Sequence, residues 1–99
     1  MIKQPEISVI IPTFNAEKTI RQTLNSIIKS KCEPFEIIIV DDKSTDKTRR
    51  IIEVFKNKHK IRYIYHAVNK GASISRNDGA RAAKGKLLVF FDNDCVVDS

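Results

Sequence analysis

Four short runs of apolar and β-branched residues recur along the chain, separated by longer stretches of mixed polarity. They are Ile7 to Ile11, Glu36 to Val40, Ile61 to Tyr65 and Leu87 to Phe91. Their length and composition are typical of β-strands. The first, second and fourth runs are apolar almost throughout, which predicts strands covered on both faces in a parallel sheet.

The stretches between these runs have the spacing of amphipathic helices. Apolar side chains recur every three or four residues from Ile20 to Ile28, which predicts a first helix. Ser44 or Asp46 can cap a second helix, and the apolar positions 51, 52 and 55 would form its buried face. A third helix is predicted over Ser73 to Ala83, with Ile74 among its apolar positions, although Gly79 lowers its helix propensity.

The alternation of strands and helices indicates the fold class. With right-handed crossovers, this order predicts a three-layer α/β/α, Rossmann-like unit with a mainly parallel four-stranded sheet. A chain of 99 residues has room for one small core, so we expect a single domain. The composition, 41% hydrophobic and 30% charged, is typical of a folded protein and excludes a disordered tail.

The charge favours an anionic partner. Lys and Arg number 18 against 12 Asp and Glu, a net charge of +6. The densest basic stretch, Lys56 to Arg62, lacks the interleaved aromatics that stack on bases, so we predict a solvated helix end and no nucleic-acid partner. Cys32 and Cys95 have neither disulfide nor zinc-site spacing, and neither a membrane helix nor a signal peptide is evident. We therefore expect a cytoplasmic location.

Polar residues follow each predicted strand, where ligands bind in open α/β sheets. The segments are Pro12 to Asn15, Asp41 to Asp46, Asn69 to Gly71 and Asp92 to Asp94. In the last of these, two carboxylates at i and i+2 can approach one hard divalent cation. An acidic turn is the alternative, but the position directly after a buried strand favours the metal.

Four other residues have both a structural and a functional interpretation. For Asp42 we favour contact with a uracil imide or ribose hydroxyl over helix capping, whereas Asp46 is assigned to capping. Arg76 can extend over the surface or bind a phosphate. Asn15 can cap the first helix or contact a ligand.

Four motifs, taken together, resemble the family 2 glycosyltransferases. They are SVIIPTFN at Ser8 to Asn15, VDDKSTD at Val40 to Asp46, NKGASISRNDG at Asn69 to Gly79 and GKLLVFFDND at Gly85 to Asp94. The resemblance implies a GT-A half-domain: residues 1–99 would be its N-terminal nucleotide-diphospho-sugar-binding part, ending after the DxD motif. Lys43 stands where the family often has Gly.

The resemblance also implies roles for particular residues. Pro12, Thr13 and Phe14 would line the base pocket, Asp42 would contact the nucleoside, and Arg76 would lie near it or the diphosphate. Asp92 and Asp94 match the DxD motif that holds Mn²⁺ or Mg²⁺. Of these two, Asp94 is the expected direct metal ligand and Asp92 is also expected to contact the donor.

The reaction that the resemblance implies is inverting transfer of a sugar from a UDP- or GDP-sugar to an acceptor hydroxyl, with metal assistance. The general base is expected beyond Ser99, so no catalytic residue is named and the chain alone is expected to be inactive. The acceptor is not identifiable. We expect peripheral membrane association of the full-length enzyme, and a homodimer because the fourth strand would be an unprotected edge.

Two other classes of function were weighed. A phosphoacceptor signalling domain is disfavoured, because its acidic pair should follow the first strand and here Asp41 and Asp42 follow the second. A non-catalytic nucleotide-sugar-binding or oligomerisation module shares every donor-site residue with the enzyme, so the sequence leaves it open.

Overall fold

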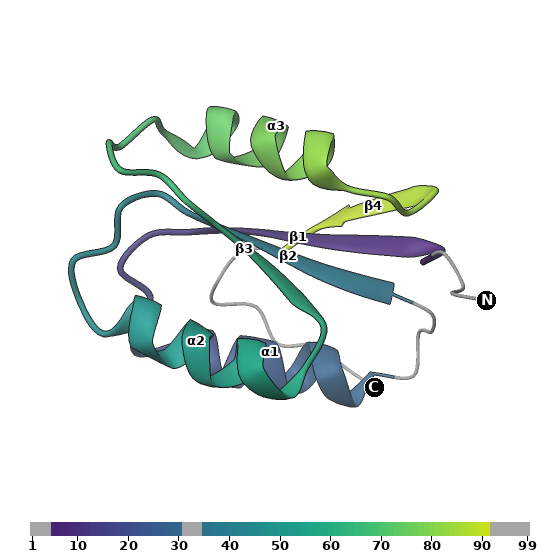
Figure 1. Ribbon diagram of the computed structural model, residues 1–99, viewed down its shortest axis with the longest axis horizontal. Coiled ribbons are helices and arrows are strands. Elements are labelled where there is room, and N and C mark those ends of the chain that lie inside the picture. Colours follow the sequence, from purple (N-terminus) through teal and green to yellow (C-terminus); the bar gives the residue numbers. More distant parts are fainter. Residues whose placement is uncertain (1–4, 31–34, 92–99) are drawn as a thin grey trace.

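The computed structural model describes residues 5–30 and 35–91, and its elements alternate as the sequence predicts (Figure 1). The strands are β1 (Ile7–Thr13), β2 (Phe35–Asp41), β3 (Ile61–Tyr65) and β4 (Leu87–Phe90). The helices are α1 (Ile20–Lys29), α2 (Thr48–Lys58) and α3 (Ala72–Ala82). All seven predicted elements are confirmed, with boundaries that differ by at most a few residues.

The strands form one parallel sheet in the order β3-β2-β1-β4. Helices α1 and α2 cover one face and α3 covers the other, which confirms the three-layer α/β/α architecture (Figure 1). In register, Thr13 pairs with Asp41 and Asp41 pairs with Tyr65. The carboxyl ends of the three strands β1, β2 and β3 therefore lie side by side at one edge, which we call the rim.

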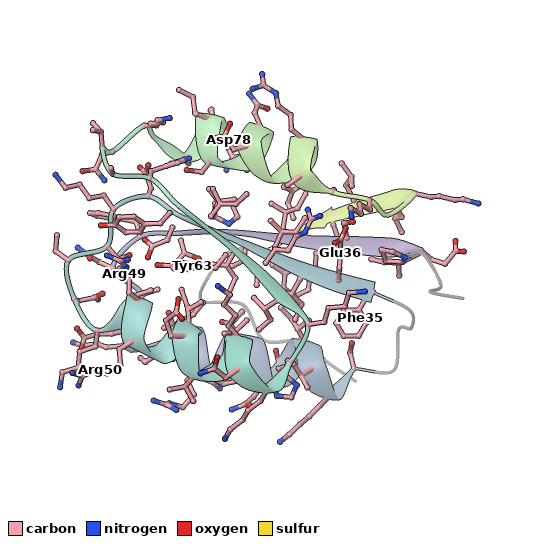
Figure 2. The ribbon with its side chains drawn as sticks, viewed as in Figure 1. Phe35, Glu36, Arg49, Arg50, Tyr63 and Asp78 are labelled. Atoms are coloured by element: carbon pink, nitrogen blue, oxygen red, sulfur yellow. The ribbon has the colours of Figure 1, made fainter. Side chains whose placement is uncertain are left out.

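At the opposite end of the strands from the rim, a buried carboxylate joins β2 to its neighbours (Figure 2). Glu36, only 4% exposed, accepts hydrogen bonds from the Ser8 hydroxyl at 2.6 Å and the Lys84 backbone N–H at 2.7 Å. Gly85 N–H donates in turn to Ser8 Oγ at 2.8 Å. Burial raises the pKa of Glu36, but these hydrogen bonds and the charges of Arg62 and Lys84 lower it overall. This cluster holds Lys84 and Gly85, the residues just before β4, against the starts of β1 and β2.

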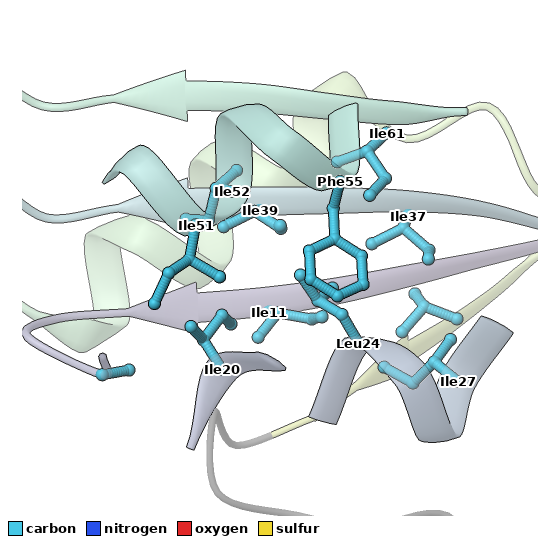
Figure 3. Close-up of a cluster of buried hydrophobic side chains, with 12 residues drawn as sticks. Ile11, Ile20, Leu24, Ile27, Ile37, Ile39, Ile51, Ile52, Phe55 and Ile61 are labelled. Carbon is cyan, nitrogen blue, oxygen red and sulfur yellow. The ribbon is translucent and has the colours of Figure 1, made fainter. Parts of the chain in front are cut away.

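The main core lies between the sheet and the α1/α2 layer (Figure 3). It is built from alternate residues of the strands and from the predicted apolar faces of the two helices. Its buried members are Val9, Ile11, Ala16, Ile20, Leu24, Ile27, Ile37, Ile39, Ile51, Ile52, Phe55 and Ile61. Each large side chain so buried contributes about 1.5–3 kcal/mol, so this layer supplies most of the hydrophobic stabilisation.

The packing of α3 follows the prediction in part. The apolar positions Ala80, Ala82 and Ala83 pack against the cluster of Ile10, Ile38 and Val40, as expected. The buried residues of the helix are Ser75 and Gly79, whereas Ile74, expected on the apolar face, is 45% exposed. The reason is that Gly79, having no side chain, lets the helix backbone approach the Ile10 and Val40 side chains closely. Gly79, which lowered the predicted helix propensity, is thus the residue through which α3 packs closely against the sheet.

Strand β4 is covered less than its composition predicts. It pairs with β1 from Ile7↔Leu87 to Ile10↔Phe90, and Leu87, Leu88 and Phe90 are 58%, 37% and 47% exposed. Among the described residues it is an edge strand, as expected, but it is not buried on both faces. No helix within these residues has the length and apolarity to span a membrane.

Candidate functional site

The loops that follow β1 and β2 are joined to each other at the rim. Asn15 N–H donates to Ser44 Oγ at 2.9 Å, and Thr45 N–H donates back to Asn15 Oδ1 at 2.8 Å. Ala16 N–H donates to Thr48 Oγ1 at 2.8 Å. Helix α1 begins at Ile20 without a side-chain cap, so the capping role considered for Asn15 is wrong. Its amide side chain instead holds the neighbouring loop.

Asp46 lies one position before the N-cap residue of α2, Lys47, and still accepts the first N–H of the helix, so the predicted capping role is confirmed in part. One carboxylate oxygen accepts the Thr48 N–H at 2.9 Å and the other accepts the Glu17 N–H at 3.2 Å. Burial raises the pKa of this carboxyl, but the hydrogen bonds from Thr48 and Glu17 lower it below its usual range. Asp46 thus satisfies free N–H groups from two different loops.

Asp41, the last residue of β2, is completely buried and has a structural role. Its carboxylate accepts the Ser44 N–H at 2.9 Å and the Tyr63 hydroxyl at 2.6 Å. Burial and this carboxylate raise the pKa of Tyr63, so the phenol stays protonated and donating. The pair joins the end of β2 to β3.

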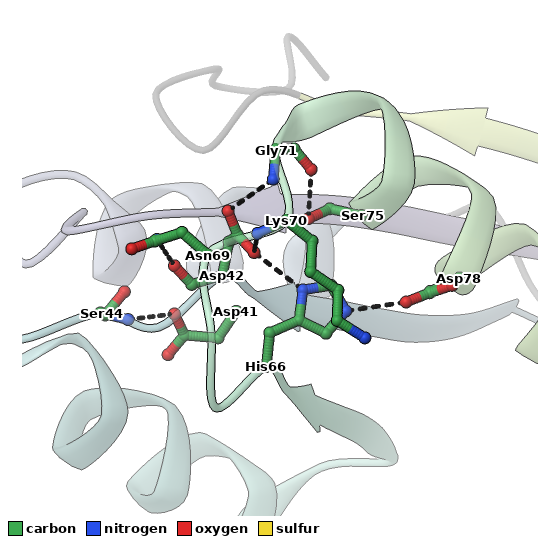
Figure 4. A network of polar contacts seen from close by, with 9 residues as sticks. All are labelled: Asp41, Asp42, Ser44, His66, Asn69, Lys70, Gly71, Ser75 and Asp78. Carbon is green, nitrogen blue, oxygen red and sulfur yellow. Dashed lines mark hydrogen bonds and ion pairs between the residues drawn. The ribbon is translucent and has the colours of Figure 1, made fainter.

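Asp42 holds the loop that follows β3 (Figure 4). Its carboxylate accepts the backbone N–H groups of Lys70 and Gly71 at 2.8 and 3.0 Å, and its carbonyl accepts the Asn69 amide at 2.5 Å. Burial raises the pKa of Asp42, but the hydrogen bonds from Lys70, His66, Gly71 and Asn69 outweigh it and lower the pKa to about 2. The side chain is therefore an anion at neutral pH.

His66 is a site residue that the sequence analysis missed. It is 5% exposed, and its Nδ1 and Nε2 lie 2.8 Å from Asp42 Oδ1 and from Asp78 Oδ2 of α3. The available signal was its position directly after β3, at the same strand edge as the acidic residues. Asp78 gave no comparable signal, because a helical Asp in a polar stretch reads as a surface residue.

The residues predicted for the base pocket differ in accessibility. Phe14 is 51% exposed at the rim, whereas Thr13 is buried, with its hydroxyl donating to the Ile11 carbonyl at 3.1 Å. The Thr13 carbonyl accepts the Asp42 N–H at 2.8 Å, so the two lie together. Pro12 is half-buried at the end of β1. Phe14 is thus the member of this group whose side chain a ligand can reach.

Two further groups of predicted residues stand apart from this network. Arg76 is exposed on α3, a position compatible with either interpretation. Asp92 and Asp94 lie outside the described residues. Within 5–30 and 35–91, no group of three or more His, Cys, Asp or Glu side chains is placed to hold a metal ion.

The rim therefore offers two chemical features to a ligand, an exposed aromatic face at Phe14 and a buried but anionic acceptor at Asp42. Helix α3, which follows the loop after β3, adds the exposed cation of Arg76. The hydrogen bonds between the loops hold the backbone beside Phe14 and the Asp42 carboxylate in place before any ligand binds. Such an arrangement suits a molecule with a planar ring, hydrogen-bond donors and negative charge.

Comparison with known proteins identifies the family. The family model described as "Glycosyl transferase family 2" matches residues 8–99. A putative teichuronic acid biosynthesis glycosyltransferase of Bacillus subtilis, TuaG, is 38% identical over 92 residues, which are 92% of this chain and 36% of that protein. The poly(ribitol-phosphate) β-N-acetylglucosaminyltransferase TarS of Staphylococcus aureus is 40% identical over 94% of this chain and 17% of that protein.

Solved structures are similar over the same region. S. aureus TarS 1-349 in complex with UDP-GlcNAc superposes with a TM-score of 0.84 at 39% identity, over 90% of this chain and 26% of that one. Mannosyltransferase PcManGT from Pyrobaculum calidifontis, in complex with GDP-Man and Mn²⁺, gives 0.89 at 25% identity, over 98% and 30%. The chain spans 36% of the length of TuaG and 17% of the length of TarS. The family-model match over nearly the whole chain, together with this shared fold, places the chain in glycosyltransferase family 2.

Proposed function

We propose that this chain forms the donor-binding part of an inverting glycosyltransferase that transfers a sugar from a UDP- or GDP-sugar to an acceptor hydroxyl. The observation that carries the proposal is the hydrogen-bonded rim, where the exposed Phe14 ring and the Asp42 carboxylate are fixed at the carboxyl ends of β1 and β2. Similarity to TarS crystallised with UDP-GlcNAc and to PcManGT crystallised with GDP-Man supports a nucleotide-sugar donor.

The rim residues have complementary roles in this proposal. The Phe14 ring and the Pro12–Thr13 backbone form one wall for the base, because an exposed aromatic beside a rigid strand end offers a flat apolar surface. Asp42 accepts a hydrogen bond from the nucleoside. Arg76 attracts the diphosphate, for which its planar donor fork is suited. Donor binding thus combines stacking, hydrogen bonding and charge.

We assign the divalent cation, Mn²⁺ or Mg²⁺, to Asp92 and Asp94. Strand β4 runs parallel to β1, so it points toward the same edge as the other strand ends. Oxygen ligands of this type suit both ions, and the Mn²⁺ named with PcManGT supports the assignment. When bound, the metal would neutralise charge that develops on the departing diphosphate.

Calorimetry with UDP-GlcNAc and with GDP-Man, each with and without Mn²⁺, tests the proposal. We expect binding of one donor, weakened at least about tenfold by Phe14→Ala and made independent of Mn²⁺ by Asp94→Ala. The controls are Val68→Ala, which truncates another exposed apolar side chain, and Glu53→Ala, which removes an exposed carboxylate of α2. A folded chain that binds neither donor would contradict the proposal.

Transfer itself needs a separate measurement. Release of UDP or GDP in the presence of candidate acceptors would distinguish the enzyme from a non-catalytic nucleotide-sugar-binding module. We expect this chain to bind donor without transferring the sugar, and a longer chain that includes the general base to do both. Donor binding without transfer in the longer chain would favour the module.

A further inference from the structure

We propose that His66 and Asp78 are positioning residues that fix the Asp42 carboxylate for donor binding, through an imidazole ring held between the two carboxylates. The inference rests on the proposed function, since it concerns the geometry of the donor-binding residue Asp42. His66 follows β3, Asp42 follows β2 and Asp78 lies in α3, so the contact joins three separate elements (Figure 4).

The His66 ring is buried, and both of its nitrogens have a hydrogen-bonding partner. The side chain of His66 is 4% exposed, and its backbone N–H donates to the Asp41 carbonyl at 2.8 Å, so the ring has little freedom to turn away. Both ring nitrogens lie 2.8 Å from carboxylate oxygens. Ionised carboxylates only accept hydrogen bonds, so a ring nitrogen that carries a proton donates to the carboxylate it faces. The ring therefore links the two carboxylates.

This contact determines which acceptor of Asp42 stays available. Oδ1 receives His66 Nδ1 and the Lys70 N–H, and Oδ2 receives the Gly71 N–H. A carboxylate offers about four lone-pair sites, so one acceptor position is left, on Oδ2. The side chain is 12% exposed, which leaves this position a route to solvent. His66 thus orients the carboxylate with one oxygen occupied and the other free for a nucleoside donor.

Asp78 extends the contact to α3. The helix is also held at its start, where the Ser75 N–H and hydroxyl both donate to the Gly71 carbonyl at 3.1 and 2.9 Å. Asp78 thus links His66 and Asp42 to this helix.

The test compares donor affinity in matched variants. His66→Ala removes the ring and Asp78→Ala removes the carboxylate on its far side, so each should raise the Kd for UDP-GlcNAc or GDP-Man about tenfold. Asp78→Asn, whose amide can still contact the ring, should keep most of the affinity. Of the two histidines, His59 is exposed, so His59→Ala should leave the affinity unchanged, as should Glu53→Gln.

A second measurement does not depend on donor binding. Hydrogen exchange of the Lys70 and Gly71 amides reports their bonds to Asp42. We expect faster exchange of both amides in His66→Ala and in Asp78→Ala, and unchanged exchange in His59→Ala. If wild type binds no donor while the exchange rates change in this way, the proposed function fails and the contact stands. Unchanged exchange in His66→Ala, or unchanged affinity in both His66→Ala and Asp78→Ala, would overturn the inference.

Discussion

Gly79 of α3 packs directly against Ile10 of β1, with no space between them for a methyl group. A Cβ at residue 79 would lie 2.4 Å from Ile10 Cγ2 and 3.2 Å from Val40 Cγ2. Ile10 is fully buried and branched at Cβ, so this methyl cannot move without displacing its neighbours. The contact sets the distance between α3 and the sheet, and with it the reach of Asp78 and Arg76.

Gly79→Ala should therefore destabilise the fold. Alanine improves helix propensity by about 1 kcal/mol, but overpacking typically costs about 1–3 kcal/mol, so a net loss of about 1 kcal/mol is expected in urea unfolding. The control is the same change in an Ile10→Ala background, where the obstructing methyl is absent. There it should be neutral or stabilising. An equal loss in both backgrounds would contradict this account of the contact.

The loops of the rim contain two residues in the left-handed backbone region, Asn15 at φ 46° and Lys43 at φ 62°. The side chain of Lys43 is exposed and gains nothing that compensates for the conformation. Lys43→Gly should therefore stabilise the fold by about 0.5–1 kcal/mol in thermal or urea unfolding.

Asn15→Gly provides the matched comparison, because it relieves the same backbone conformation but removes the acceptor of the Thr45 N–H. We expect it to destabilise by about 1 kcal/mol. If both glycine variants changed stability in the same direction, the backbone and side-chain contributions assigned to these two positions would be wrong.

The lowered pKa of Asp42 predicts how stability depends on pH. The folded pKa of about 2 lies below the ordinary 3.8, so the ionised carboxylate contributes about 2 kcal/mol at neutral pH. This contribution is present above pH 3.8 and is lost as the pH falls toward 2. Asp42→Asn should therefore destabilise the protein at pH 7, and the difference from wild type should shrink toward pH 2.5. Urea unfolding at several pH values measures it.

Glu53→Gln is the control for this series, because Glu53 is exposed on α2 and its removal should change stability little at any pH. A constant difference between wild type and Asp42→Asn from pH 7 to about pH 2.5 would indicate that packing, and not the carboxylate charge, accounts for the effect.

The sequence predicted the sheet and its helices because most elements follow a simple hydrophobic period. The apolar residues of α1 and of α2 recur with helical spacing on one face of each helix, and the buried strands are apolar runs. The α3 face followed this period only in part, because the alanines of its last turns pack as predicted but Gly79 packs through its lack of a side chain. Ile74, an apparent core residue, is consequently exposed.

The candidate site was predictable only in part. Asp42 could be found because the carboxyl ends of parallel strands are where ligands bind. The same rule could have singled out His66, which directly follows β3, but not its contacts, because they join it to Asp42, 24 positions earlier, and to Asp78, 12 positions later. Such pairings depend on crossover geometry and loop conformation, which hydrophobic periodicity does not encode.

The exposed edge of β4 predicts self-association. Of the two edge strands of the described sheet, β3 carries Arg62, whose guanidinium donates to the Ala82 carbonyl, whereas β4 exposes Leu87, Leu88 and Phe90. An apolar edge without charged side chains is a template for pairing with another chain. Sedimentation velocity at tens of micromolar should therefore detect a dimer of this chain.

Leu88→Lys should shift that dimer to monomer, because a lysine ammonium placed between paired edges would lose its hydration without gaining a partner. Val54→Lys is the matched control, since Val54 is 45% exposed on α2 and lies far from the edge. It should leave the dimer intact. A wild-type chain that stays monomeric at this concentration would contradict the predicted dimer. If both lysine variants dissociated it equally, the interface would lie elsewhere than β4, or the added charge would account for the dissociation.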